Sequence, residues 1–208
     1  MRTLDAIWKI YLDRDLNPQE LKDLIWHIEN DEDPQDAISI TADMGLKSLG
    51  HVLAKHLNHN KPFIRQLTIG CLLGQLELPE YAEKGLEMAQ NDDDHVRNIA
   101  IFDIGGVINK APFPLTKKIA AYLLESFKYD ECEVIRGSAY HAILTAMEIP
   151  RDKRPPASRV VKELDINQSI VSDFCKKYNI STVEKKKIHH QKEGNDWKSQ
   201  AVHPSSIH

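Results

Sequence analysis

Membrane spans, secretion signals and paired cysteines are all missing from this 208-residue chain, and each absence excludes a class of protein. No apolar run approaches the roughly 18–20 residues that span a bilayer, so we expect no membrane helix. The first residues lack an apolar signal core, which predicts a cytosolic, cytoplasmic location. The three cysteines are odd in number and widely spaced, without a CxxC pair, so no disulfide framework is expected.

Catalytic signatures are missing as well. The chain has no glycine-rich phosphate loop, no GxSxG nucleophile elbow and no HExxH zinc motif. Its aromatic residues are few, with 3 Trp, 6 Tyr and 5 Phe, as expected of a helical array built on leucine, isoleucine and alanine. We therefore predict no catalytic residue, no cofactor and no metal, and an enzyme is the less favoured hypothesis.

Charge is divided unevenly along the chain. Residues 1–150 hold 15 Lys and Arg against 24 Asp and Glu, a net charge of −9, whereas residues 151–208 hold 12 against 7, a net charge of +5. An acidic body repels phosphate backbones and attracts basic partners. We therefore expect a basic protein partner rather than nucleic acid. The alternative is that the surface charge serves solubility alone.

An arginine recurs near the start of three apolar segments. Arg65, Arg97 and Arg136 are separated by 32 and then 39 residues, and each follows an apolar residue. A small side chain follows three positions after each arginine: Thr68, Ala100 and Ala139. A unit of this length holds two helices and two turns, and recurrence at about 30–47 residues indicates helical repeats. Stacked repeats bury the apolar faces that one helix pair alone leaves exposed.

Helix-start and helix-stop residues divide the chain into segments. Asn17, Pro18 and Glu20 form a capping-box pattern, Pro34 follows a carboxylate at a second start, and Gly45 is a candidate stop. Pro, Asn, Asp or Gly lies at every later turn, and no segment alternates like a strand. These signals predict a first helix over 4–12 and four outer–inner helix pairs: 18–30 with 34–44, 46–58 with 62–76, 79–90 with 94–109, and 115–128 with 132–147.

The stretch Asp94-His95-Val96-Arg97, followed by Ala100 and Gly105-Gly106, resembles the second helix of a HEAT-type repeat. Over residues 34–147 the chain resembles the short bacterial form of that family. The resemblance implies an all-α fold, a right-handed α-solenoid of about four HEAT-like helical hairpins with N- and C-terminal capping helices. A fold does not fix a function, so the resemblance is stronger evidence for architecture than for chemistry.

The basic, proline-rich segment 150–156 marks a domain boundary. It separates a HEAT-like repeat domain over 1–150 from C-terminal capping helices over 151–180, for which 158–164 and 166–178 are the candidate segments. The tail over 181–208 is basic, offers little apolar surface and is predicted to be largely disordered.

The predicted inner helices supply the candidate contact residues. Their arginines would form a basic ladder that binds carboxylates or phosphates on a concave face. The alternative is that each arginine ties a neighbouring turn or acid inside the stack, because half-buried arginine usually needs an internal partner. The predicted partner-binding residues are Arg65, Gln66, Arg97, Asn98, Asp103, Arg136, Tyr140 and His141.

Three other clusters suggest a ligand but have a simpler explanation. The acidic turns over 29–36 and 92–94 do not match a calcium loop, and helix capping explains them. His56 and His59 lack a third ligand for zinc, which favours solvated histidines. The lysine run 185–187 is shorter than the usual nucleic-acid or membrane cluster, which favours a solvated tail.

Two functions remain for comparison. The favoured one is a non-enzymatic module that binds a basic protein through its concave face, as an adaptor or as an inhibitor of the immunity type. The alternative is a HEAT-like DNA glycosylase for alkylated bases, a class that uses a basic groove with an aromatic and acidic pocket. The acidic body argues against it, as does the position of Trp8 and Trp26 outside the inner helices. HEAT-like phycobilin lyases are a further enzymatic relative, without a specific mark in this chain. The sequence does not indicate the oligomeric state.

Overall fold

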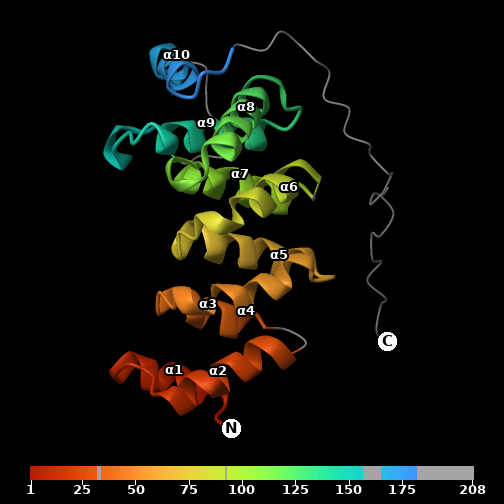
Figure 1. Ribbon diagram of the computed structural model, residues 1–208, viewed down its shortest axis with the longest axis vertical. Helices are drawn as coiled ribbons and strands as arrows, with labels where there is room; N and C mark the ends of the chain where they lie inside the picture. The colour runs from red at the N-terminus through yellow and green to blue at the C-terminus, as the bar shows by residue number, and fades with distance from the viewer. Residues whose placement is uncertain (32–33, 92, 157–164, 182–208) are drawn as a thin grey trace, which may run out of the picture.

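The computed structural model describes residues 1–31, 34–91, 93–156 and 165–181. These residues form helices and turns without any strand, which confirms the all-α fold class. The helices follow one another along the long axis of the molecule, from the N-terminus at one end to α10 at the other (Figure 1). Within the described ranges, no helix combines the length and the apolar character that crossing a membrane requires.

Ten α-helices and six shorter helical segments make up the described chain. The α-helices are α1 (Leu4–Asp13), α2 (Pro18–Asn30), α3 (Gln35–Asp43), α4 (Gly50–Leu53), α5 (Pro62–Ile69), α6 (Ala82–Asn91), α7 (Asp94–Val107), α8 (Phe113–Tyr129), α9 (Glu133–Ala146) and α10 (Gln168–Lys177). The shorter segments are η1 (Lys47–Leu49), η2 (Ala54–Asn58), η3 (Gly70–Gln75), η4 (Pro79–Tyr81), η5 (Ile108–Lys110) and η6 (Arg151–Lys153), of which η3 is π-helical.

The predicted helix signals at the N-terminal end are confirmed. The Asn17 side chain accepts hydrogen bonds from the backbone N–H of Gln19 and Glu20, and the Glu20 carboxylate accepts one from Asn17, so the capping box is complete. After α3 the chain turns at Gly45, whose φ of +63° is the left-handed conformation that favours glycine at a helix end. The residue expected to cap α3, Asp33, lies outside the described residues.

The segment predicted as one helix over 46–58 is helical without a break over 47–58, but it is not a regular α-helix. This stretch consists of η1, the single turn of α4 and η2. Gly50 packs closely against Leu78, since a Cβ there would lie 2.5 Å from Leu78 Cδ1. The ring nitrogen Nδ1 of His51 also hydrogen-bonds the Ser48 carbonyl at 2.9 Å, a local contact that competes with a regular helix.

The inner helices from residue 62 onward agree closely with their predicted ranges, because their apolar positions recur with the helical period. α5 continues into η3, and together they cover the predicted 62–76. α7 with η5 covers 94–110 and α9 covers 133–146. The described part of the C-terminal capping region is α10, whereas the predicted helix over 158–164 and the tail from 182 lie outside the described residues.

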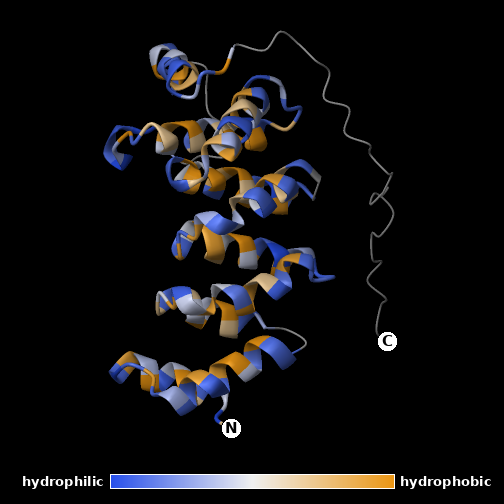
Figure 2. Ribbon diagram, in the orientation of Figure 1, coloured by the Kyte–Doolittle hydropathy of each residue, from blue (hydrophilic) through white to orange (hydrophobic). Residues whose placement is uncertain are grey.

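The inner helices α5, α7 and α9 pack in a row, with α6 packed on α7 and α8 packed on α9. Apolar residues lie between neighbouring helices and polar residues along their outer sides (Figure 2). The closest approach is at Gly105, where a Cβ would lie 2.6 Å from the Cα of Ala142 on α9. This contact puts the central parts of α7 and α9 side by side, which positions the site described below.

Candidate binding site on the inner helices

The three repeated arginines form hydrogen bonds and ion pairs within the stack. Arg65 donates from Nη1 to the carbonyls of His59 and Asn60, at 3.0 and 3.3 Å. Arg136 makes the equivalent contacts with the carbonyls of Asp130 and Glu131, at 2.7 and 3.4 Å. Each side chain therefore ties the turn six and five residues before it to the start of its own helix.

The arginines also join successive inner helices. Arg65 Nη2 lies 3.7 Å from the carboxylate of Asp93, which caps α7. Arg97 Nη2 lies 2.5 Å from the carboxylate of Asp130, in the turn before α9, and both side chains are buried. Arg97 also donates to the carboxylate of Asp94 and to the carbonyl of Ala89. These contacts agree with the structural alternative for the arginine series.

Two more of the predicted contact residues form hydrogen bonds inside the protein. Tyr140 is only 1% exposed; its hydroxyl accepts a hydrogen bond from the backbone N–H of Asn167 at 2.8 Å, and so anchors the chain before α10. Asn98 accepts a hydrogen bond from the hydroxyl of Ser138, which joins α7 to α9. Gln66 is half-buried on α5.

The last two predicted residues, Asp103 and His141, lie together. They line a hollow of about 600 Å³ at the C-terminal halves of the inner helices. η3 contributes Leu73 and Gly74, and α7 contributes Phe102, Asp103 and Gly106. α9 contributes His141 and Thr145, and the segment after it contributes Arg151, Arg154, Pro155 and Pro156. The volume falls in the range of about 300–1,000 Å³ that is usual for ligand sites.

Gly74 makes room for the Asp103 carboxylate, whereas Gly70 leaves it at an ordinary contact distance. A Cβ at Gly74 would lie 2.7 Å from its Oδ1, and a Cβ at Gly70 would lie 3.6 Å from its Oδ2. Among the described residues Asp103 has neither a hydrogen-bond donor nor a basic partner. Burial without such a partner disfavours the charged form and raises the pKa of Asp103 to about 7.

His141 is the second polar group of the hollow and is 6% exposed. Burial lowers the pKa of its ring, against a smaller opposite effect of a hydrogen bond with the Pro156 backbone, so it is neutral at pH 7. Within the described ranges, its Nε2 is buried and has no hydrogen-bond partner.

Two arginines from the segment after α9 also line the hollow. Arg154 donates from Nε to the Ile149 carbonyl and from Nη1 to the Thr145 hydroxyl, both at 2.7 Å, so its guanidinium is held in place. Arg151 is exposed and its charge lowers the pKa of Arg154, although burial contributes more to that shift. Neither arginine forms an ion pair with Asp103 in the part of the chain that the structure describes.

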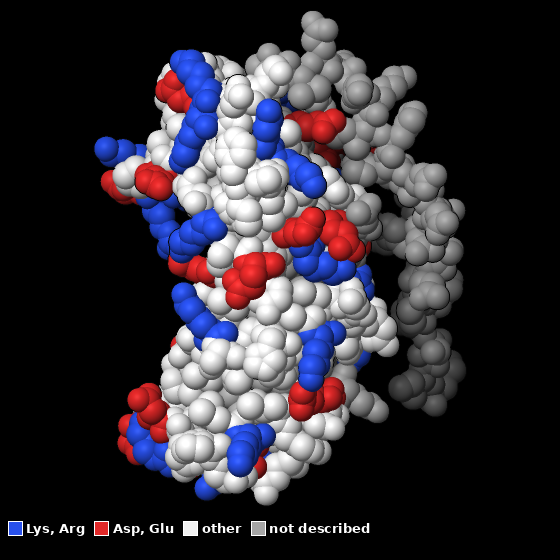
Figure 3. Space-filling model, viewed as in Figure 1, with Lys and Arg blue, Asp and Glu red and all other residues white. Residues whose placement is uncertain are grey.

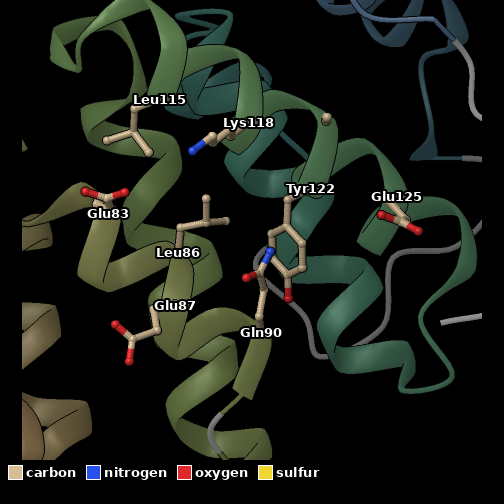
Figure 4. A pocket seen from close by; sticks show the side chains of 9 residues that line it. Glu83, Leu86, Glu87, Gln90, Leu115, Lys118, Tyr122 and Glu125 are labelled. Atoms are coloured by element: carbon tan, nitrogen blue, oxygen red, sulfur yellow. The ribbon is translucent and has the colours of Figure 1, made fainter. Parts of the chain in front are cut away.

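A second hollow, of about 620 Å³, lies on the outer helices between α6 and α8 (Figure 4). Leu86 and Leu115 supply its apolar surface, and Tyr122 lies beside Gln90. The Tyr122 hydroxyl is already engaged, since it donates to the Ala89 carbonyl. The acidic groups of this outer hollow are Glu83, Glu87 and Glu125. Glu87 forms an ion pair with Lys84 at 2.8 Å. This outer hollow serves below as a control surface, because none of its residues lines the inner hollow.

The sequence prediction missed the two arginines of the inner hollow, as well as Phe102 and the glycines under Asp103. The signal for the arginines was present in the basic, proline-rich segment 150–156, which was interpreted only as a boundary. No group of three His, Cys, Asp or Glu side chains in the described part of the chain is arranged to hold a metal ion. No protein-family model, curated protein or solved structure matches this chain.

Proposed function

We propose that this chain is a non-enzymatic, HEAT-like helical repeat protein that binds a basic protein partner through its inner helices. In this proposal four helical hairpins stack as a right-handed α-solenoid, α1 and α10 cap its ends, and the protein acts as an adaptor or as an inhibitor of the immunity type. The observation that carries the proposal is the inner hollow, where Asp103 and the Nε2 of His141 have no hydrogen-bond partner among the described residues.

The charge of the chain supports the same partner. The excess of nine acidic charges over residues 1–150 favours a basic protein in long-range attraction and encounter rate. On the face drawn in Figure 3, basic and acidic side chains are interspersed rather than separated into one field. The acidic excess therefore acts as a general attraction, whereas specific recognition falls to the hollow.

Capture with matched surface variants tests this proposal. The full chain, its Asp103→Arg variant and its Glu83→Arg variant are used as baits in an extract from the native source, and bound proteins are identified by mass spectrometry. We expect a basic protein that binds the wild-type chain and the Glu83→Arg control but not Asp103→Arg. A protein retained equally by all three baits would place the interface elsewhere, and a bound nucleic acid would contradict the proposal.

A DNA glycosylase for alkylated bases is the second candidate, because the hollow places an acid beside an exposed aromatic ring and two arginines. Phe102 is 42% exposed and directly precedes Asp103. The acidic body remains the argument against this reading, since phosphate contacts dominate DNA affinity. Release of a methylated base from alkylated duplex DNA, lost in Asp103→Asn, is the result that would establish the enzyme over the binding module.

A further inference from the structure

The inner hollow keeps opposite charges apart. Asp103 lies on its α7 side, against the glycines of η3, and Arg151 and Arg154 lie on the side formed by the segment after α9. No ion pair or hydrogen bond joins Asp103 to a basic side chain among the described residues, and burial raises its pKa. An acid and two guanidinium groups that share one hollow without pairing leave space for a ligand that carries both charges.

The acidic side of the hollow favours a planar cation. The Asp103 carboxylate can accept two parallel N–H donors, and the exposed ring of Phe102 beside it offers an aromatic face. A guanidinium group matches both features, because it is planar, donates in a fork and stacks on aromatic rings. The Nε2 of His141, which is buried and has no partner among the described residues, adds a polar group to this side of the hollow.

The basic side of the hollow favours a carboxylate. Arg154 is held by Ile149 and Thr145 through Nε and Nη1, which leaves its Nη2 for another partner. Arg151 is exposed and forms no side-chain hydrogen bond or ion pair within the described residues, so its guanidinium can move toward a bound anion. Two adjacent guanidinium groups that repel each other are stabilised by a shared carboxylate.

We propose that the inner hollow is a subsite for a C-terminal arginine residue of the partner, with the guanidinium on Asp103 and Phe102 and the α-carboxylate on Arg151 and Arg154. This proposal rests on the proposed function, since it names the group by which a basic protein is recognised. The charged and titratable groups that face Asp103 across the hollow are Glu77, His141, Arg151 and Arg154. Of these, Glu77 is already paired with Lys110 at 2.6 Å.

Calorimetric titration of the full chain with small probes tests the subsite directly. The probes are N-acetyl-arginine, its amide, which lacks the carboxylate, and N-acetyl-citrulline, which keeps the shape of arginine without its charge. We expect N-acetyl-arginine to bind, and each of the other probes to bind about tenfold more weakly because it loses one charge-assisted contact. Equal binding of all three probes, or no saturable binding at millimolar concentrations, would overturn the subsite.

Two single variants assign the two ends of the probe. Asp103→Asn should remove the preference for arginine over citrulline and keep the preference for acid over amide. Arg151→Gln should reduce the preference for acid over amide and keep the preference for arginine. Lys118→Gln in the outer hollow should change neither preference, and thermal unfolding checks that every variant is folded. A variant that alters both preferences alike, or neither, contradicts the assigned orientation.

The outcomes separate this subsite from the broader proposal. A captured partner that is lost in Asp103→Arg, together with no binding of N-acetyl-arginine, retains the binding module and overturns the C-terminal arginine. Binding of N-acetyl-arginine with the expected variant pattern, but no protein partner dependent on Asp103, supports the subsite and overturns the protein-binding function.

Discussion

Charged side chains are paired at the N-terminal ends of the inner helices and unpaired at their C-terminal ends. At the N-terminal ends, the carboxylate of Asp130 is buried against Arg97, and Arg65 and Arg136 close the preceding turns. At the C-terminal ends, Asp103 is held over glycines and away from Arg151 and Arg154. Charges that pair inside the stack stabilise it, whereas charges kept apart in a hollow remain able to bind. The contrast indicates that a conspicuous arginine series can serve internal contacts, and it is the reason why we propose Asp103 as the binding group.

Removal of the buried ion pair at the N-terminal ends of the inner helices should have the largest effect on stability. Arg97→Met leaves the buried Asp130 carboxylate and the Ala89 carbonyl without this donor, so we expect a loss of about 3–5 kcal/mol in the free energy of unfolding. Arg136→Met is the matched control, because its side chain is 35% exposed, and should cost about 1 kcal/mol. Urea unfolding followed by circular dichroism measures both. An equal loss for the two variants would contradict the distinction between buried and exposed arginines.

Two adjacent glycines on α7 test how closely α7 and α9 pack. A Cβ at Gly105 would lie 2.6 Å from Ala142 Cα, so Gly105→Ala should destabilise the protein by about 1–3 kcal/mol. A Cβ at Gly106 meets no atom within 4 Å, so Gly106→Ala should stabilise it by about 0.5–1 kcal/mol through helix propensity. Thermal unfolding of the two variants side by side gives the answer, and effects of the same sign would refute the close α7–α9 contact.

The unpaired Asp103 carboxylate should destabilise the folded protein in a pH-dependent way. The folded-state pKa of Asp103 is raised from 3.8 to about 7, so the native state favours the protonated carboxyl. Its contribution to stability is fully present below about pH 4 and is lost as the pH rises through about 7. Asp103→Asn should therefore stabilise the protein at about pH 8 by on the order of 1–3 kcal/mol, and by much less at about pH 4. Urea unfolding at the two pH values tests this, and a pH-independent effect would contradict it.

Arg151→Gln should produce the smallest change in stability. Its side chain is exposed, so the free energy of unfolding should change by less than about 0.5 kcal/mol while binding at the hollow weakens. Urea unfolding and titration with N-acetyl-arginine on the same preparation separate the two effects. A stability loss as large as that of Arg97→Met would mean that Arg151 forms stabilising internal contacts, as Arg97 does, and is not available to a ligand.

Local signals in the sequence predicted the all-α class and the positions of most described helices. The capping box at Asn17 and Glu20, the glycine stop at 45 and the arginine period are set by contacts within a few residues or by helical periodicity. The 46–58 segment was predicted as a regular helix, whereas 3-10 segments flank the single turn of α4, and Gly50 packs against Leu78 through a tertiary contact that local propensity does not encode. Part of the tertiary packing is therefore not visible in local sequence patterns.

The site was predictable only in part. Asp103 and His141 were identified as inner-helix residues, since their positions follow from the repeat. The hollow itself depends on Arg154 folding back onto Ile149 and Thr145, which brings the segment after α9 against the inner helices. Composition alone marked that segment as a boundary. The internal roles of Arg97 and Tyr140 likewise depend on partners 33 and 27 residues away.

The pKa of Asp103 is the most direct test of the claim that this carboxylate is left open for a ligand. Carboxyl-carbon NMR titration of the full chain, with Asp103→Asn used to assign the signal, measures it with and without saturating N-acetyl-arginine. We predict a pKa of about 7 in the free chain and a clear decrease on binding, because the guanidinium favours the charged carboxylate. An ordinary value near 3.8 in the free chain, or one that the probe leaves unchanged, would contradict the claim.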